Sequence, residues 1–483
     1  MAAASGGRVS LNPLPNESGR VFDQDLAQKV VETAINAGAS YAEIRVVSNQ
    51  NTSISMRNGK VRNAIPGHDV GATLRCLVDG SWGVYSSSDL AVILPSVETT
   101  VGLARQIAQR RAKGEVKVEL AEISISNTEV HWKPEQDIRD IDIEEKVSVL
   151  REFDAAIRSD DRIISVSTGF SDEHLHTELT TSEGMERAWS FQRTCTNAIV
   201  TGREDSEVAS YRTRVGGVGG YELIDRIDLD AVAEEATEST IRILSAKRSP
   251  SGRMSLVADP DLTGVYIHEA LGHPCEADLV AAGDSCLDGK LGQMIGDPLV
   301  SVIDDPTWQG GHGSFPIDDE GIDTFSRTLI KDGRLMTYLN HRQGAAYFDI
   351  APNGAARAQD GLHHPLVRMS NTLILGGKHQ DLDELLEDVQ DGVYACGTRG
   401  GQVDTGRGSF QFAAQQAWRI RNGELAEALK DVSVSGMTLS ILKNIDGLTK
   451  DAVLASPGFC GKGQIVPVGD GGPAMRIRDA LVG

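Results

Sequence analysis

Two glycine-containing dipeptides near the start of the chain constrain its fold more than any other feature. Asn58-Gly59 and Asp79-Gly80 each separate two runs in which apolar and polar residues alternate. Such dipeptides form two-residue turns whose twist matches that of antiparallel strands, so each predicts a β-hairpin. The alternation predicts strands at 41–47, 52–56, 61–65, 71–78 and 82–86. We therefore expect an antiparallel meander in this part of the chain.

Amphipathic helices flank the meander. Apolar residues recur at helical spacing, and Gly38 ends the first of these segments. The helices are expected at 22–37, 88–112, 143–157 and 229–244, and further short strands at 163–168, 178–181, 187–193 and 197–202. These elements predict an N-terminal α/β domain over residues 22–246, preceded by a mobile arm at residues 1–21 that is rich in proline, asparagine and glycine.

A polar linker at 246–252 separates this domain from a second one. After the linker, short strands, glycines and turns dominate, and Asp332-Gly333 and Asn422-Gly423 predict two more hairpins. Helices are expected there only around residue 268 and at 382–390. The sequence thus predicts an α+β fold, in which a β-rich C-terminal domain, residues 253–483, carries the helix of the motif described below.

Charge and composition exclude several classes of function. The net charge is −22, which argues against binding to nucleic acid or to an anionic membrane. No apolar run reaches the roughly 18 residues of a membrane span. The six cysteines form no CxxC pair, which is typical of reduced thiols. With no apolar signal at the N-terminus, these features predict a cytoplasmic protein.

The segment His268-Glu269-Ala-Leu-Gly-His273 contains the components of a metal site that activates water: two imidazoles and one carboxylate. Its histidines are five residues apart, whereas zinc-protease helices use a spacing of four. On an ideal helix they would point roughly 140° apart. Gly272 tolerates unusual backbone angles and Pro274 disfavours helix at the residue before it. We therefore expect the helix to distort or end at Gly272.

A third ligand would strengthen this hypothesis, and several thiols are candidates. Cys275 is near in sequence, although so close a ligand would strain the chelate. Cys286 and Cys396 have unremarkable surroundings. Cys460 lies among glycines, and the nearby Lys462 favours the thiolate, so chemistry gives Cys460 a slight preference. A buried thiol in a turn fits these residues equally well. Separately, the acidic run Asp318-Asp319-Glu320 is expected to be a solvated turn.

Five segments in fixed order resemble the TldD/PmbA family of metalloproteases, in particular its TldD-like catalytic branch. They lie at 268–278, 317–321, 368–372, 400–404 and, as the last pair, 460–464 with 467–469, and the resemblance extends over about residues 22 to 480. It implies that His268, His273 and Cys460 bind Zn²⁺ and that Glu269 is the catalytic carboxylate. Cys275 stands where many relatives carry a non-thiol residue, which leaves a competing thiol near the metal.

The resemblance also implies a function. It indicates a zinc-dependent metallopeptidase that hydrolyses unfolded or flexible polypeptides, in peptide maturation or antitoxin-type clearance. The substrate is expected to bind as an extended strand, with Arg357, Arg368, Asn371, Gly401 and Gln402 as candidate substrate-binding residues. A homodimer, or a heterodimer with a PmbA-like subunit, is implied. The alternatives are a non-catalytic or partner-dependent subunit and a zinc hydrolase acting on small molecules. The intact motif argues against the non-catalytic subunit, which would have no need of Glu269 between two histidines.

Overall fold

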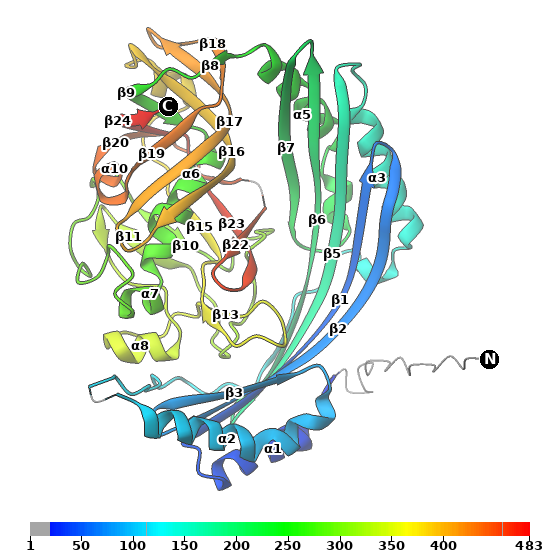
Figure 1. Ribbon diagram of the computed structural model, residues 1–483, viewed down its shortest axis with the longest axis vertical. Helices are drawn as coiled ribbons and strands as arrows, with labels where there is room; N and C mark the ends of the chain where they lie inside the picture. Colours follow the sequence, from blue (N-terminus) through cyan, green and yellow to red (C-terminus); the bar gives the residue numbers. More distant parts are fainter. Residues whose placement is uncertain (1–19, 113, 456) are drawn as a thin grey trace.

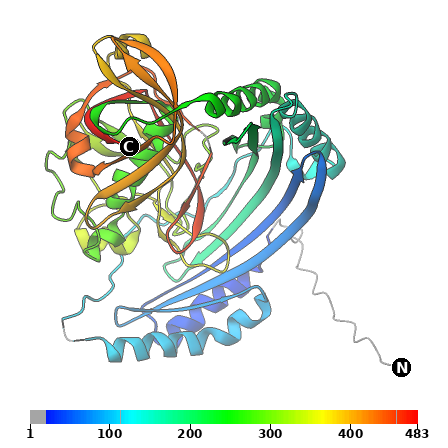
Figure 2. The same ribbon diagram turned by 45° about the horizontal axis from the view of Figure 1, so that its top comes forward.

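The computed structural model describes residues 20–112, 114–455 and 457–483, and the fold is α+β. The predicted mobile arm, residues 1–21, lies almost entirely outside the described residues. A long curved sheet forms most of the N-terminal part, and the C-terminal part sits against its concave side (Figure 1). Turning the molecule shows the same curvature (Figure 2).

The N-terminal sheet has the strand order β3-β2-β1-β5-β6-β4, and β7 pairs with the same edge of β6 as β4, farther along the strand. All neighbours are antiparallel except β4 and β6. The elements of this part are α1 Gln24–Asn36, β1 Tyr41–Arg57, β2 Lys60–Val78, β3 Ser81–Ser87, α2 Ile93–Arg110, β4 Glu129–His131, α3 Ile143–Ile157, β5 Ile163–Thr181, β6 Glu186–Glu204, β7 Glu207–Val218, α4 Glu222–Arg226 and α5 Leu229–Ser245, with 3₁₀ turns at Leu90–Val92 and Ile138–Asp140.

The four predicted helices and both N-terminal hairpins are confirmed, but the predicted strand lengths are wrong. Each pair of short strands expected from the sequence is one continuous strand of 17 to 19 residues in β1, β2, β5 and β6. The predicted breaks between the short strands fall at polar stretches such as residues 48–51. These residues stay in the sheet because β2 and β5 pair with both edges of β1 there. Polarity alone therefore does not end a strand that has two neighbours.

The two faces of β1 have different neighbours. Even-numbered side chains pack under helices: Ile44 belongs to the cluster with α1 and α2, and Met56 to the cluster with α3 and α5. Odd-numbered side chains such as Arg45 reach the C-terminal part instead. Because successive side chains of a strand point to opposite faces, the long sheet joins its helices to the C-terminal part.

The C-terminal part contains two main sheets around one large apolar cluster. The first sheet has the strand order β16-β9-β24-β19-β17-β18-β8. Because β16 at its start also pairs with β17, the sheet closes on itself. The elements are β8 Lys247–Arg248, β9 Gly252–Ala258, α6 Pro260–Ile267, α7 Ala277–Ala281, β10 Val302–Asp304, β11 Arg327–Lys331, β12 Arg334–Leu335, α8 Arg342–Phe348, β13 Ala356–Arg357, β14 Leu366–Val367, β15 Asn371–Ile374, α9 Leu382–Leu386, β16 Asp391–Asp404, β17 Ser409–Arg421, β18 Glu424–Lys430, β19 Ser433–Met437, α10 Thr438–Asn444, β20 Ile445–Leu448, β21 Val453–Leu454, β22 Gly458–Gly461, β23 Ile465–Gly472 and β24 Met475–Val482.

The hairpins predicted at 332–333 and 422–423 are confirmed: they join β11 to β12 and β17 to β18. The described cysteines are free thiols. Among the described residues, no helix is long and apolar enough to cross a membrane.

Buried arginines of the N-terminal sheet hold one loop of the C-terminal part, residues 318–323. Their pairs are Arg45 with Asp319 at 3.1 Å, Arg75 with Glu320 at 3.1 Å and Arg187 with Asp323 at 2.7 Å. The predicted solvated turn at 318–320 is therefore wrong. The acidic run is a contact between the two parts, because partners more than a hundred residues away in sequence neutralise it.

Candidate metal centre

Helix α6 carries the motif and lies directly against β23. A Cβ atom on Gly264 would approach the backbone nitrogen of Gly471 to 2.4 Å, so only glycine allows this contact. Asp259 caps the helix by accepting a hydrogen bond from Leu262 N–H (2.8 Å). Because β22 pairs with β23, the close contact also brings Cys460 near the end of the helix.

The helix does not end at the motif but widens. Residues His268–Gly272 form a π-turn, in which the backbone N–H of His273 donates to the carbonyl oxygen of His268. Residues five apart then lie above one another, so the two imidazoles face the same side, with ring centroids 5.2 Å apart. The predicted distortion is confirmed, although Gly272 keeps right-handed helical angles. Its role is steric, because a Cβ atom there would lie 1.9 Å from Sδ of Met369.

His268, His273 and Cys460 converge, and one ligand atom from each lies within 4.8 Å of the others. All three side chains are buried. Cys460 Sγ is 3.2 Å from His273 Nε2, near the roughly 3.3–3.8 Å expected between two ligands of one tetrahedral zinc ion. His268 Nδ1 is buried and has no hydrogen-bond partner among the described residues. The donor set is one that zinc prefers.

The electrostatics of the cluster favour a thiolate. Burial raises the pKa of Cys460, but the charges of His268 and His273 and the hydrogen bonds with them outweigh burial and lower it to about 4. Burial lowers the pKa of His268, whereas Cys460 raises it, with a net value of about 9. The protein without metal therefore holds positive charge beside the thiolate, where a metal cation would compensate it.

Glu276 was not predicted as a site residue, although its spacing of three from His273 was visible. Its side chain is completely buried, and Oε2 lies 2.9 Å from His273 Nδ1. A carboxylate that accepts from one ring nitrogen turns the other nitrogen toward a metal and fixes the tautomer. Burial raises the pKa of Glu276, but His273 and Lys462 lower it below its usual value.

Two cations connect Glu276 to the hairpin that carries the thiol. Lys462 Nζ lies 3.2 Å from Glu276 Oε2 and donates to Asp278 (2.9 Å). Arg368 Nη2 donates to the carbonyl oxygen of Cys460 (2.6 Å), and its Nε lies 3.9 Å from Glu276 Oε1. One buried carboxylate thus ties the helix that supplies two candidate ligands to the strand that supplies the third.

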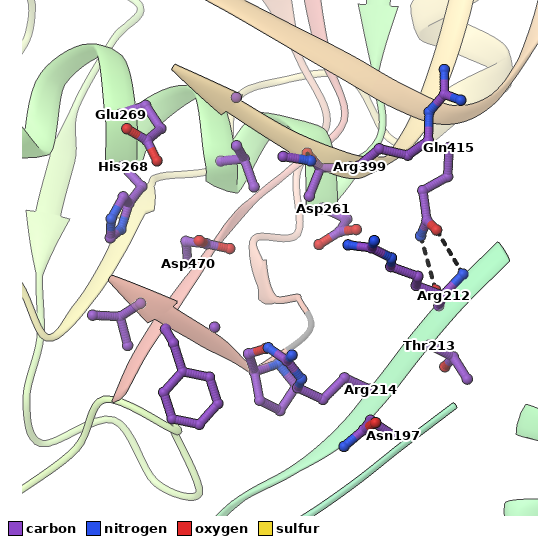
Figure 3. A pocket seen from close by; sticks show the side chains of 18 of the residues that line it. Asn197, Arg212, Thr213, Arg214, Asp261, His268, Glu269, Arg399, Gln415 and Asp470 are labelled. Atoms are coloured by element: carbon purple, nitrogen blue, oxygen red, sulfur yellow. Dashed lines mark hydrogen bonds between the residues drawn. The ribbon is translucent and has the colours of Figure 1, made fainter. Parts of the chain in front are cut away.

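The centre opens into a cleft of about 400 Å³ between the two parts of the molecule. His268 and Glu269 lie on one side of the cleft, and the β7 residues Arg212 and Arg214 lie on the other (Figure 3). Asp470 also lines it, and burial raises the pKa of this carboxyl to about 7. A carboxylate beside a candidate metal centre at the end of a cleft is an arrangement suited to hydrolysis.

The predicted substrate-binding residues occupy different places. Gly401 lines the cleft, whereas Gln402 is exposed and does not line it. Arg357 donates to the carbonyl oxygen of Met369 (2.5 Å) and lies over the Phe315 ring. Asn371 and Arg368 are fully buried, and their side chains bond to neighbouring loops and strands. A contact of these residues with substrate stays a prediction.

Cys275 lies apart from the cluster. It is fully buried in the apolar core, and burial raises the pKa of its thiol. Its sulfur is not among the converging ligand atoms of the described residues.

Three family models match almost the whole chain: PmbA/TldA metallopeptidase domain 1 over residues 42–108, the central domain over 136–244 and the C-terminal domain over 251–483. The chain belongs to the TldD/PmbA family. The last of these models contains the three converging residues and Glu269, so the candidate centre lies within the region that the family shares.

Relatives within the family are similar over nearly their full length. A protein of Methanothermobacter thermautotrophicus named metalloprotease is 40% identical over 92% of this chain and 95% of its own. A zinc metalloprotease TldD homolog of Saccharolobus solfataricus is 28% identical over 94% of this chain and 99% of its own length. Among solved structures, a putative modulator of a DNA gyrase from Thermotoga maritima has a TM-score of 0.77 at 19% identity over 95% and 100% of the chains. The structure of TldE from Thermococcus kodakarensis has a TM-score of 0.72 at 16% sequence identity, and the match covers 94% of this chain and 99% of that one. These two structures show the fold.

Proposed function

We propose that this protein is a zinc-dependent peptidase that cleaves unfolded or flexible polypeptides in the cleft between its two parts. The convergence of His268, His273 and Cys460 beside Glu269 carries the proposal. The names of the relatives, metalloprotease and zinc metalloprotease, support it. A cleft of about 400 Å³ accepts a short extended segment and excludes a folded domain.

His268, His273 and Cys460 would hold the ion, and Glu276 would keep His273 in the right tautomer. When bound, zinc supplies a Lewis acid that polarises water and the peptide carbonyl. Glu269 accepts a proton from water in the cleft and returns it to the leaving amine. The walls of the cleft hold the peptide close to this carboxylate, which lowers the entropic cost of the reaction.

The test uses an unfolded peptide with a fluorophore and a quencher at its ends. We expect the zinc-loaded protein to cleave it, a chelator to stop cleavage and added zinc to restore it. Glu269→Gln should bind zinc with unchanged stoichiometry but cleave at least about a hundredfold more slowly. Cleavage that resists the chelator, or full activity of Glu269→Gln, would exclude this mechanism.

The partner is part of the same proposal. TldE, whose fold this chain shares, bears a name that pairs with TldD. We infer that the chain works as a dimer, either with a second copy or with a PmbA-like subunit. Light scattering on the chain alone and mixed with such a subunit distinguishes the two. If cleavage requires the second subunit, the chain is a partner-dependent component and not a peptidase by itself.

A further inference from the structure

The two sides of the cleft carry opposite charges. Glu269 and Asp470 lie toward the metal centre, whereas Arg212 and Arg399 extend from β7 and β16, and Asp261 is drawn between the two groups (Figure 3). The whole chain has a net charge of −22, so arginines gathered on one wall depart from its average surface. A basic wall within a cleft raises the local concentration of anions and orients them.

A β-bulge places Arg399 at the wall of this cleft. Thr398 pairs with Ala414 and Gly401 with Phe412, so two residues of β16 face one residue of β17. Gly400 has a φ of +103°, which favours glycine at this position. Bulges re-aim side chains, and here residues 398–401 all line the cleft. Arg399 Nε donates to the carbonyl oxygen of Ala414 (3.1 Å), which holds the base of the guanidinium.

The side chain of Gln415 fixes the backbone of Arg212. The side-chain amide of Gln415 accepts from the backbone N–H of Arg212 (2.8 Å) and donates to its carbonyl oxygen (2.9 Å). Gln415 thus pairs with the edge of β7 as a neighbouring strand would, and its side chain is buried. The guanidinium of Arg212 forms no hydrogen bond or ion pair with the residues that the structure describes. Its backbone is held in place while its cation remains available.

Both guanidinium groups have unused donors. Arg399 Nη1 forms an ion pair with Asp431 at 3.7 Å, a distance longer than a hydrogen bond. Arg214, by contrast, donates to the carbonyl oxygen of Pro457 (2.9 Å) and lies over the Phe459 ring. The unused donors therefore belong to Arg212 and Arg399.

A second cavity of about 360 Å³ continues the cleft on the far side of these arginines. It shares Arg212, Arg399 and Gln415 with the first, and its further charged lining residues are Arg248, Lys430, Glu207 and Asp431. Lys430 is paired with Glu207 (2.7 Å). An elongated ligand can therefore extend from the metal centre past both arginines and remain within the groove.

We propose that Arg212 and Arg399 form a carboxylate-binding subsite, and that the preferred substrates are peptides carrying a carboxylate some residues away from the bond that is cleaved. The planar guanidinium fork binds a carboxylate through two hydrogen bonds. An acidic side chain and a free C-terminus offer the same group, so either can occupy the subsite. This inference rests on the proposed peptidase function.

Binding of labelled peptides to the Glu269→Gln protein tests the subsite without catalysis. The reference peptide is short, neutral, acetylated and amidated. One set of test peptides carries a single glutamate at successive positions, and another set carries a free C-terminal carboxylate. We expect one of these sets to bind about ten- to a hundredfold more tightly than the reference, as one charged hydrogen-bonded contact allows. The set of peptides that binds more tightly than the reference identifies the source of the carboxylate, a side chain or the C-terminus.

Substitutions assign the preference to residues. In the same background, Arg212→Gln and Arg399→Gln should each lower the ratio of carboxylate to neutral binding, and a double change to glutamate should favour a lysine peptide instead. Arg407→Gln is the matched control, because Arg407 is 85% exposed on the same hairpin and outside both cavities. Zinc content and melting temperature verify the fold of each variant.

The outcomes are distinct. Equal binding of neutral and carboxylate peptides, or a preference that both glutamine variants retain, overturns the subsite. A preference in Glu269→Gln that the two variants abolish supports it. If the wild-type protein with zinc cleaves none of these peptides while the preference persists, the peptidase proposal fails and the carboxylate subsite stands.

Discussion

The backbone N–H of His273 donates a hydrogen bond to the carbonyl oxygen of His268, five residues earlier in the chain. This π-type bond, in place of the usual bond four residues back, turns both imidazoles to one side of the helix. A spacing that an ideal α-helix cannot use for one metal ion thereby becomes usable. π-turns are rare and are frequently found at functional sites.

The first prediction concerns the packing under this turn. Gly272→Ala places a Cβ atom against Sδ of the fully buried Met369. We expect a loss of about 1–3 kcal/mol in the free energy of unfolding and a lower zinc stoichiometry, because the turn must shift. Denaturant titration and metal analysis measure both effects.

The control for Gly272→Ala is Gly102→Ala in helix α2, where a new Cβ atom meets nothing within 4 Å. That change should leave zinc binding intact and stabilise the helix slightly. In the double variant Gly272→Ala/Met369→Ala the two losses should be less than additive. Full stability and full zinc content in Gly272→Ala would show that the close contact is not needed.

The second prediction separates two buried cysteines. Cys460→Ser should lose stoichiometric zinc, since it removes the thiolate beside both histidines. Cys275→Ser should keep its zinc and lose stability instead, because it puts a hydroxyl into the apolar core. Metal analysis after dialysis, with a melting curve for each variant, checks the pair. Retained zinc in Cys460→Ser together with loss in Cys275→Ser would move the third ligand to Cys275.

The third prediction concerns Glu276. Glu276→Gln keeps the size of the side chain but removes the charge that orients His273 and meets Lys462. Zinc affinity should fall about 10- to 100-fold, measured by competition with a chromophoric chelator. The exposed Glu424→Gln serves as control and should bind zinc like the wild type. An unchanged affinity in Glu276→Gln would leave the buried carboxylate with a role in folding alone.

The fourth prediction concerns the contact between the two parts of the molecule. Burial raises the pKa of Glu320, but Arg75 lowers it, and the net value lies below the usual 4.5. A depressed acid stabilises the fold above its usual pKa, and that contribution disappears as pH falls through the pKa of the folded state. The wild type should therefore lose stability on acidification below about pH 4.5, and Glu320→Gln should lose less over the same range.

At neutral pH, Glu320→Gln should cost about 3–5 kcal/mol, because part of the charge of the buried Arg75 is left uncompensated. Thermal unfolding between pH 3 and 7 measures both effects. Glu427→Gln, which breaks a partly exposed ion pair with Arg421, should change stability little at any of these pH values. A pH profile of Glu320→Gln parallel to that of the wild type would contradict the proposed linkage.

Local patterns predicted much of the secondary structure. The turns at Asn58-Gly59 and Asp79-Gly80 have the positive φ angles that such dipeptides favour, and helix α3 has the predicted bounds, residues 143–157. Strand lengths were predicted poorly because a strand continues wherever neighbours pair with it. The buried contacts of residues 318–323 were missed because their arginine partners lie far away in sequence.

For the candidate site, the sequence by itself determined the kinds of ligand, the spacing of the histidines and the need for a distorted helix at 268–273. Only the tertiary structure decided that the distortion is a π-turn and that Cys460, 187 residues after His273, comes to lie 3.2 Å from it. The tertiary structure also placed the carboxylate of Glu276 behind His273 and the arginines of β7 and β16 across the cleft. The physical reason is that these arrangements follow from the packing of α6 on β23 and of one half of the chain on the other, and no local pattern contains such long-range contacts.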